Sequence, residues 1–259
     1  MLFGTAVLLA AASVRGVDAQ RISRSWDQTY LGANARAWTA VEGPDHAVYV
    51  GANRVLRFDG ERWKTMNVEG GYAVRAIAFD PRGRMWVGAN RQLGYFDPTS
   101  DGWSPFRSLT PTLPTGSDIR EVWQVFADKR GATFFAQSQI LRFRDGQWQR
   151  WDFAGARRLP ACEIDGVIWF HHGPTGVWSL RGEKPELEIP SDAVNVGEDV
   201  VYLATTANRI TLVSRRGLFQ WHDRQLLPWS PVAMEFVRAH NLTTVCTLPD
   251  GRVVIGTLR

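Results

Sequence analysis

The sequence predicts an all-β fold made of small repeated sheets, on three observations. The stretch from Val74 to Asp97 contains three short apolar strands, VRAIAF, MWVGA and LGYFD, joined by tight turns. These strands are almost continuously apolar rather than alternating, which is typical of sheets covered on both faces. The same turn-and-strand unit recurs along the chain at intervals of 35 to 48 residues. A period of this length predicts a β-propeller built from four-stranded blades.

About six repeats are present, and the last is truncated. The second strands align when six residues are placed at equivalent positions, namely Gly51, Gly88, Ala136, His171, Ser214 and Gly256. A fourth strand of the second repeat is expected around Trp103 to Phe106. Tryptophans of the outer strands follow the same rhythm and are expected to pack between blades, namely Trp63, Trp103, Trp148 and Trp229. A short helix is expected near Val232 to Ala239.

The segment FDPRGRMWVGANRQLGYFD resembles the two-component regulator propeller repeat, whose pattern is a D-x-x-G turn, Trp-Ile-Gly-Thr, then Gly-Leu and an aromatic residue. VYVGANRVLRFDG, VWQVFADKRGATFFAQSQILRF, RRGLFQW and LPDGRVVIGTLR match successive blades in the family's order. WD40 repeats fit poorly because no Gly-His precedes the repeats and no Trp-Asp follows them. The resemblance implies the N-terminal propeller of a periplasmic sensor protein.

In this family the full-length protein continues with more blades, an immunoglobulin-like domain and a membrane helix. A histidine kinase, a helix-turn-helix regulator or a diguanylate cyclase then follows. The resemblance therefore implies a sensing segment that is not itself an enzyme, with an oligosaccharide as the ligand in parts of the family. A ligand would shift the population between arrangements of the propeller, or of a homodimer of it.

The N-terminus predicts export. Leu2 to Ala12 is an apolar core of the length found in signal peptides, and Val17-Asp18-Ala19 offers a cleavage site before Gln20. Arg15 and Asp18 interrupt the run, so it does not predict a transmembrane helix. We expect residues 1–19 to be a signal peptide and residues 20–259 to be one incomplete propeller domain, periplasmic or extracellular. The alternative is an apolar N-terminus with no targeting role.

The cysteines and the net charge predict no disulfide, cofactor or nucleic-acid partner. Cys162 and Cys246 fall in first strands of repeats that are not neighbours, so two buried free thiols are expected rather than a disulfide. The net charge is +4, and all but three of the 30 basic residues are arginine. The sequence contains no basic run, zinc-ligand spacing or glycine-rich phosphate loop. We therefore expect no nucleic-acid partner, no metal and no cofactor.

The acidic and histidine residues do not predict catalysis. The recurring acids all fall at the turn after a first strand, where Asp caps the local backbone, namely Asp45, Asp80, Asp128, Asp165 and Asp250. His171 and His172 are adjacent, so a strand would direct them to opposite faces. Two alternatives to a sensor stay open: a secreted propeller lyase or hydrolase acting on polysaccharide, and a scaffold that binds a protein.

The turns after the second strands are expected to share one rim with the connections between blades. Arginines at the starts of first strands would lie inward of them, with Trp38 and Trp123 nearest the axis. The candidate ligand-binding residues are Arg36, Arg54, Arg75, Asn90, Arg91, Arg120, Trp123, His171 and Arg215. Because guanidinium groups bind carboxylates in a bidentate way, an acidic sugar is the expected ligand. Glu69 and Asp118 would weaken this field, and a neutral ligand is the alternative.

Overall fold

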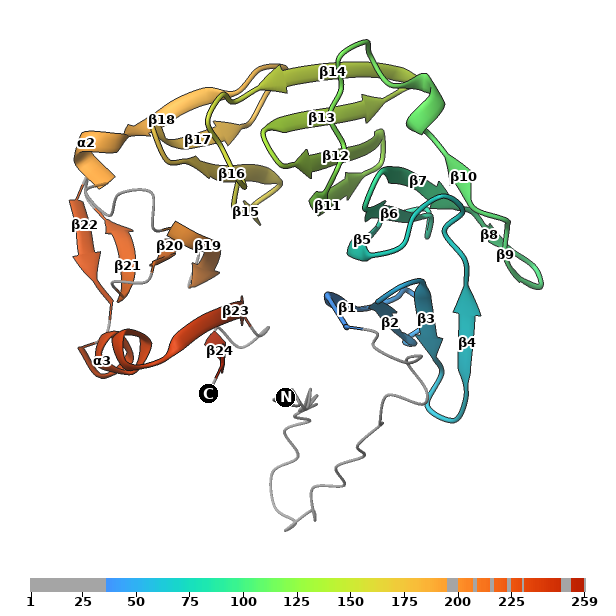
Figure 1. Ribbon diagram of the computed structural model, residues 1–259, viewed down its shortest axis with the longest axis horizontal. Coiled ribbons are helices and arrows are strands. Elements are labelled where there is room, and N and C mark those ends of the chain that lie inside the picture. Colours follow the sequence, from blue (N-terminus) through green and yellow to red (C-terminus); the bar gives the residue numbers. More distant parts are fainter. Residues whose placement is uncertain are drawn as a thin grey trace.

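A computed structural model describes residues 36–194, 200–206, 209–214, 217–222, 225–229, 231–247 and 253–258. The chain forms five four-stranded antiparallel sheets and a sixth sheet of two strands, arranged as successive blades around one axis (Figure 1). The predicted β-propeller architecture is confirmed. The predicted signal peptide lies outside the described residues.

The strands are grouped by blade as follows. Blade 1 contains β1 (Thr39–Glu42), β2 (Val48–Gly51), β3 (Val55–Phe58) and β4 (Trp63–Met66). Blade 2 contains β5 (Val74–Phe79), β6 (Met85–Ala89), β7 (Gln92–Phe96) and β10 (Arg107–Ser108). Blade 3 contains β11 (Val122–Asp128), β12 (Gly131–Ala136), β13 (Gln139–Arg144) and β14 (Gln147–Asp152). Blade 4 contains β15 (Ala161–Ile164), β16 (Val167–His172), β17 (Gly176–Leu180) and β18 (Glu186–Pro190). Blade 5 contains β19 (Val200–Thr206), β20 (Arg209–Ser214), β21 (Gly217–His222) and β22 (Gln225–Pro228). Blade 6 contains β23 (Asn241–Thr247) and β24 (Val253–Leu258).

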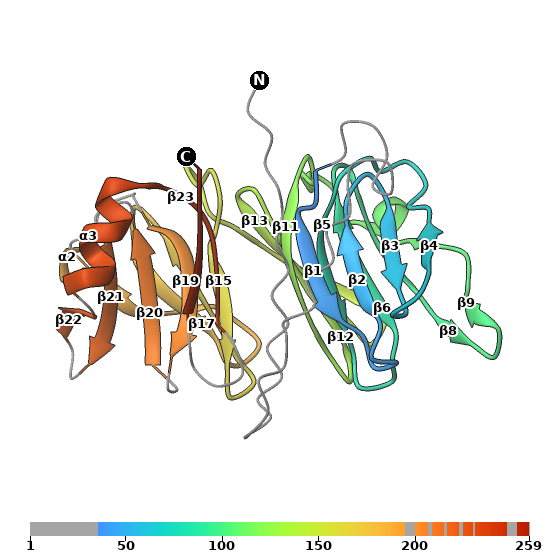
Figure 2. The same ribbon diagram turned by 90° about the horizontal axis from the view of Figure 1, so that it is seen from below.

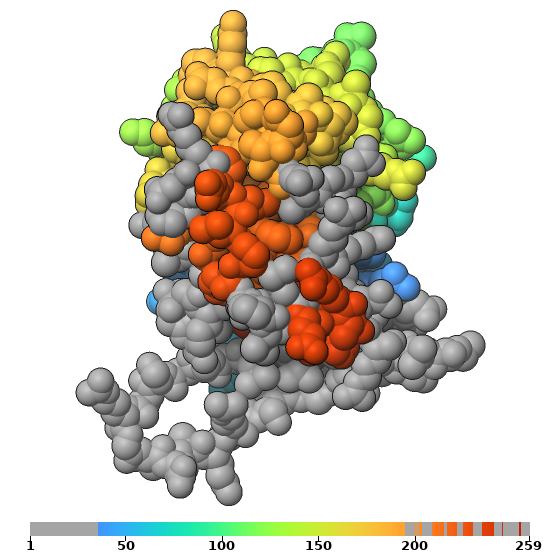
Figure 3. Space-filling model, turned by 90° about the vertical axis from the view of Figure 1, so that its left-hand side faces the viewer, coloured from blue at the N-terminus to red at the C-terminus, as the bar shows by residue number. Residues whose placement is uncertain are grey.

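Each blade starts at the axis and steps outward, so β1, β5, β11, β15, β19 and β23 are the innermost strands (Figures 1 and 2). Three short helices lie in the connections between blades: the 3₁₀ helix η1 (Thr110–Thr112), α2 (Ser191–Val194) and α3 (Pro231–Ala239). Helix α3 confirms the helix expected from the sequence. Figure 3 shows the outer side of the molecule, where residues of blade 4 and α2 lie above those of blade 5 and α3.

The hydrophobic core is divided into layers between successive blades. Tyr49 and Val55 of blade 1 pack with Met85 and Val87 of blade 2. Equivalent clusters join blades 2 and 3, 3 and 4, 4 and 5, and 5 and 6. Both faces of an inner sheet are therefore covered, and every residue of β6 and of β12 is buried. This burial on both faces explains the continuous apolar runs in the sequence.

The repeated acid after the first strand caps its turn in blades 1, 2 and 3, as the sequence predicted, whereas Asp165 of blade 4 makes no such bond within the described residues and instead adopts a positive φ of 50°. In blade 2, Asp80 Oδ1 accepts from the amides of Arg82 at 2.9 Å and Arg84 at 3.0 Å. Its other oxygen accepts from Trp86 Nε1 at 3.1 Å, which links the turn to the buried second strand. Asp128 caps its turn in the same way through the amides of Arg130 and Gly131. Asp250 lies outside the described residues.

Blade 2 departs from the sequence prediction at its fourth strand. That strand is β10, and the residues expected there instead lead out of a separate hairpin, β8 (Pro98–Thr99) and β9 (Gly102–Trp103). The hairpin projects from the outer side of the blade (Figures 1 and 2). Trp103 still packs between blades, because its indole contacts Tyr49 of blade 1. The ten-residue excursion falls in the 48-residue interval between Gly88 and Ala136, the longest of the repeat spacings, but spacing alone does not show that the extra residues form a hairpin.

The cysteine prediction is confirmed for the residue that can be tested. Cys162 is a buried free thiol in β15, in the layer between blades 4 and 5. Burial raises its pKa to about 12, and the nearby carboxylate of Glu163 adds to the shift. Cys246 lies in β23, opposite Val254 of β24, and its side chain lies outside what the structure describes.

Candidate functional site at the axis

The innermost strands of four blades share one irregularity. The register of β5 with β6 shifts between Val74 and Ala76, so Arg75 is the extra residue of a β-bulge. The same shift makes Trp123 the extra residue of β11, and it recurs in β19 at Val201 and in β23 at Thr243. A bulge releases one residue from the ladder and redirects its side chain, and bulges are frequent beside functional sites. In each of these four blades, one residue of the innermost strand is therefore released from strand pairing at the axis.

The register also corrects the sequence alignment of the second strands. Ala76 pairs with Gly88 directly after the bulge, and Thr244 pairs with Gly256 at the same place. In blades 3 and 5 the residues at that place are Phe135 and Val213, one position earlier than the predicted Ala136 and Ser214. Sequence spacing could not reveal this, because the equivalent positions are defined by the pairing of the strands.

Arginine and tryptophan side chains alternate in a stack across four blades, which we call the axial ladder: Trp38, Arg75, Trp123 and Arg158. The guanidinium carbon of Arg75 lies 3.9 Å from the ring centre of Trp38 and 4.2 Å from that of Trp123. The guanidinium carbon of Arg158 lies 4.9 Å from the Trp123 ring centre. Trp38 immediately precedes β1, and Arg158 lies in the connection before β15. Each cation–π contact stabilises the stack by about 0.5–2 kcal/mol, depending on its burial.

Arg75 is held by two polar neighbours. Its Nε donates to Asn90 Oδ1 at 3.1 Å, and its Nη2 donates to Glu121 Oε1 at 2.7 Å. The remaining nitrogen, Nη1, is buried and has no hydrogen-bond acceptor in the part of the chain that the structure describes. Asn90 is itself buried at the end of the second strand of its blade, and its amide is tied to Ala73 O. The charge of Arg75 is thus matched by one carboxylate while one of its donors stays unused.

The other half of the ladder has no counter-charge. Within the described residues, Trp123 Nε1 and Arg158 Nε are buried without an acceptor, and no carboxylate pairs with Arg158. Burial lowers the pKa of Arg158; the nearby Tyr202 opposes this shift, and the positive charge of Arg75 adds to it. Three buried N–H groups without acceptors therefore meet in one stack beside an uncompensated guanidinium. Such an arrangement is suited to bind an anion or another hydrogen-bond acceptor.

The rim predicted from the sequence has the expected position, but one of its arginines is already paired with a carboxylate. Inter-blade hydrogen bonds place the turns after the second strands beside the connections: Val74 N donates to Ala52 O, and Arg91 N donates to Ile119 O. Arg120 is paired with Asp118 at 2.8 Å, the residue expected to weaken the field. Arg36, Arg54 and Arg91 are exposed, without side-chain partners in the described part of the chain.

Two predicted ligand-binding residues remain, His171 and Arg215. His171 is 3 % exposed in β16, and burial next to His172 lowers its pKa to about 4. His172 is buried too, with its ring nitrogens at 2.7 Å from Thr175 Oγ1 and 3.0 Å from Ala154 O. Arg215 lies outside the described residues. Of the predicted set, the structure brings together Arg75, Asn90 and Trp123.

Sequence reasoning missed two members of this site. Arg158 stands three residues before the first strand of its blade, as Arg36 does in blade 1, so the rule that selected Arg36 would also have selected Arg158. Glu121 stands two residues before Trp123, and its role was not predicted because its partner Arg75 is 46 residues away in sequence. Only the packing of blade 2 against blade 3 brings these two charges together.

Residues 69–91, which hold the bulge, strand β6 and Asn90, match the family model described as two component regulator propeller. The chain carries a two-component regulator propeller repeat. The match includes Arg75 and Asn90 of the axial site. No curated protein sequence matches the chain.

Solved structures with the same fold are β-propellers of diverse kinds. A catalytically inactive virginiamycin B lyase from Staphylococcus aureus, in complex with quinupristin, superposes with a TM-score of 0.67 at 12% identity, over 93% of this chain and 83% of that one. The WD40 propeller domain of Doa1 gives 0.60 at 13% identity, over 86% and 76%. PorZ of Porphyromonas gingivalis gives 0.60 at 15% identity, over 89% of this chain and 39% of PorZ. At these identities the similarity shows the fold alone.

Proposed function

We propose that this two-component regulator propeller is the ligand-sensing segment of a membrane signalling protein, and that it works in the periplasm or outside the cell. The ligand is an acidic oligosaccharide that binds at the axial ladder. The observation that carries the proposal is the set of three buried N–H groups without acceptors on Arg75, Trp123 and Arg158. Within the described residues, no helix is long and apolar enough to cross a membrane. Anchoring in the membrane through other parts of a full-length protein is a separate element of this proposal.

The chemistry of the ladder supports an acidic sugar. A buried donor without an acceptor costs about 1–3 kcal/mol, so a ligand oxygen that accepts from it recovers that energy on binding. A carboxylate matches the planar fork of Arg158, which has no counter-charge of its own. Trp38 is 39% exposed and offers an aromatic face against which the apolar face of a sugar ring can stack. Ligand would shift the population of propeller or homodimer arrangements, and the membrane-proximal parts of a full-length protein would transmit that shift.

We propose further that this segment binds its ligand without transforming it. The two adjacent histidines are buried, and the ring nitrogens of His172 are engaged by neighbouring oxygens, so neither imidazole is presented to a ligand at the rim. The alternatives are a secreted lyase or hydrolase acting on polysaccharide, and a scaffold for a protein partner. Release of unsaturated or reducing sugar from a bound oligosaccharide would identify the first of these.

Calorimetry with the purified chain tests the proposal. A uronic-acid oligosaccharide should bind more tightly than a neutral oligosaccharide of the same length. Arg158→Gln should weaken the acidic ligand by at least about tenfold, since a hydrogen bond to a charged group contributes roughly 1.5–3 kcal/mol. Arg120→Gln is the matched control, because Asp118 already balances that charge. Equal binding of both oligosaccharides, or equal effects of both substitutions, would count against the proposal.

A further inference from the structure

A second concave site lies away from the axis, on the outer side of blades 1 and 2. It is a cavity of about 550 Å³, a size typical of small-molecule sites. Its walls come from the turn between β1 and β2, from β3 and β4, from the turn between β5 and β6, and from the β8–β9 hairpin. The hairpin, an insertion in the four-stranded pattern, closes one side of it.

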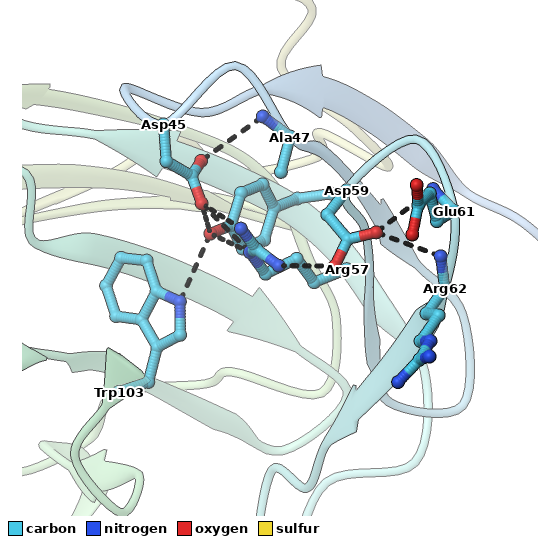
Figure 4. A network of polar contacts seen from close by, with 8 residues as sticks. Asp45, Ala47, Arg57, Asp59, Glu61, Arg62 and Trp103 are labelled. Carbon is cyan, nitrogen blue, oxygen red and sulfur yellow. Dashed lines mark hydrogen bonds and ion pairs between the residues drawn. The ribbon is translucent and has the colours of Figure 1, made fainter. Parts of the chain in front are cut away.

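The inner wall of the cavity is a fixed polar network (Figure 4). Asp45 Oδ2 accepts from Arg57 Nη2 at 2.7 Å and from the Tyr49 hydroxyl at 3.0 Å. That hydroxyl accepts in turn from Trp103 Nε1 at 3.1 Å. Burial by itself raises the pKa of Asp45, but the hydrogen bonds from Arg57 and Tyr49 outweigh it and hold the pKa below its ordinary value. These groups already have partners, so they shape the wall and are not the groups that capture a ligand.

The network also fixes an aromatic surface. The rings of Trp103 and Tyr49 meet edge to face at 88°, and the Nε1 hydrogen bond prevents the indole from rotating. Trp103 is half-buried and lines the cavity together with Met66, Pro44 and Pro98. This side of the cavity is therefore apolar, and it can receive a flat ring.

Two cations on the lining have no partner. Lys64 and Arg82 are exposed, and within the described part of the chain their side chains make no hydrogen bond or ion pair. Lys64 stands directly opposite Arg57 in the β3–β4 ladder, and like charges in that position repel each other. Asp101 is the one carboxylate of the described lining without a partner. The unpaired charges thus sum to one positive charge, which suits a monoanion.

The geometry does not favour inorganic phosphate. Phosphate is bound by free backbone amides as well as by arginine and lysine side chains, and the turn beside Arg82 offers no free amides. Its amides at Arg82 and Arg84 donate to Asp80 Oδ1, and the Gly83 amide donates to Asp80 O. Side-chain cations next to an aromatic surface remain, and these suit an organic anion.

We infer that this lateral cavity binds a small organic monocarboxylate that carries a planar apolar ring. The ring packs against Trp103 and Met66, and the carboxylate lies between Lys64 and Arg82. Because the walls belong to two blades and the hairpin, an occupied cavity links the β8–β9 hairpin to blade 1. This site is independent of the axial ladder and does not require the sensing role proposed for it.

Phenylacetate is a suitable probe, with phenylacetamide as its uncharged isostere and acetate as the anion without a ring. In amide-detected NMR of the full chain, phenylacetate should shift the Trp103 indole N–H saturably and leave the Trp123 indole N–H unchanged. Phenylacetamide and acetate should each bind at least about tenfold more weakly. Lys64→Gln with Arg82→Gln should weaken phenylacetate by at least about tenfold.

The control pair is Arg62→Gln with Lys129→Gln, which removes the same charge from exposed positions outside the cavity. It should leave phenylacetate affinity within about twofold. Equal affinity for phenylacetate and phenylacetamide, equal effects of the two double substitutions, or no shift of the Trp103 peak at roughly 10 mM phenylacetate would each overturn the inference. Arg158→Gln separates the two sites, because it should weaken an acidic oligosaccharide and leave phenylacetate binding unchanged.

Discussion

Removing one hydroxyl from the buried network between blades 1 and 2 should destabilise the fold measurably. Tyr49 is fully buried, and its hydroxyl donates to Asp45 and accepts from Arg57 Nε and Trp103 Nε1. In Tyr49→Phe, Arg57 Nε keeps its bond to Asp45 at 2.9 Å. Trp103 Nε1, in contrast, loses its acceptor. The substitution therefore removes two charge-assisted bonds, of which only the one from Arg57 has a substitute in Asp45, and it leaves one indole donor unpaired.

The size of the effect follows from these two losses. A hydrogen bond to a charged group contributes about 1.5–3 kcal/mol, and an unpaired donor costs about 1–3 kcal/mol. Both free energies are smaller in this protein, because the Asp45 side chain is 37% exposed and Trp103 is half-buried, so water replaces part of each bond. We expect the free energy of unfolding to fall by about 2 kcal/mol.

Urea denaturation followed by tryptophan fluorescence and circular dichroism measures this change. Tyr95→Phe is the matched control, since the Tyr95 hydroxyl makes no hydrogen bond within the described residues. It should change stability by less than about 0.5 kcal/mol. If Tyr49→Phe is as mild as Tyr95→Phe, the network does not stabilise the contact between the two blades.

Two further predictions concern buried titratable groups. His171 has a folded pKa of about 4 against an ordinary 6.5, so its contribution to stability is full above pH 6.5 and is lost as the pH falls toward 4. The free energy of unfolding should drop by up to about 3 kcal/mol over that interval. In urea titrations at each pH, His171→Gln should flatten this dependence of stability on pH. A slope unchanged by that substitution would contradict the burial of a neutral imidazole. Cys162 should resist a thiol reagent in the native protein and react in denaturant without prior reduction, because burial raises its pKa to about 12. A Cys162–Cys246 peptide linked by a disulfide, detected by mass spectrometry, would contradict the free thiol.

The sequence predicts the parts of this fold that depend on local pattern. Strands β5 and β6 have the predicted bounds, because their apolar runs end at the Asp80 turn and before Arg91, which has a positive φ of 59°. The helix near Val232 and the burial of Cys162 follow in the same way. The β8–β9 hairpin was missed because two-residue strands carry no periodicity.

The axial site was predicted only in part, for physical reasons that differ by residue. The strand start and the tryptophan near the axis indicated Arg75 and Trp123. The bulge that turns both away from the ladder is a pairing irregularity and has no sequence signature here. Arg120 is not the free charge that the sequence predicted. Its side chain folds back onto Asp118, and the sequence does not specify which rotamer an exposed arginine adopts. The pairing of Arg75 with Glu121 exists only after two blades pack together.

The most direct test of the axial site is the state of the Trp123 indole N–H when a ligand binds. In selectively ¹⁵N-labelled protein, its signal can be assigned among the twelve tryptophans by a Trp123→Phe variant. With a uronic-acid oligosaccharide, that signal should move downfield because the buried donor gains an acceptor, while the Trp103 signal, already bonded to Tyr49, should stay in place. Calorimetric binding of the oligosaccharide with an unmoved Trp123 signal would place the ligand elsewhere and contradict the account.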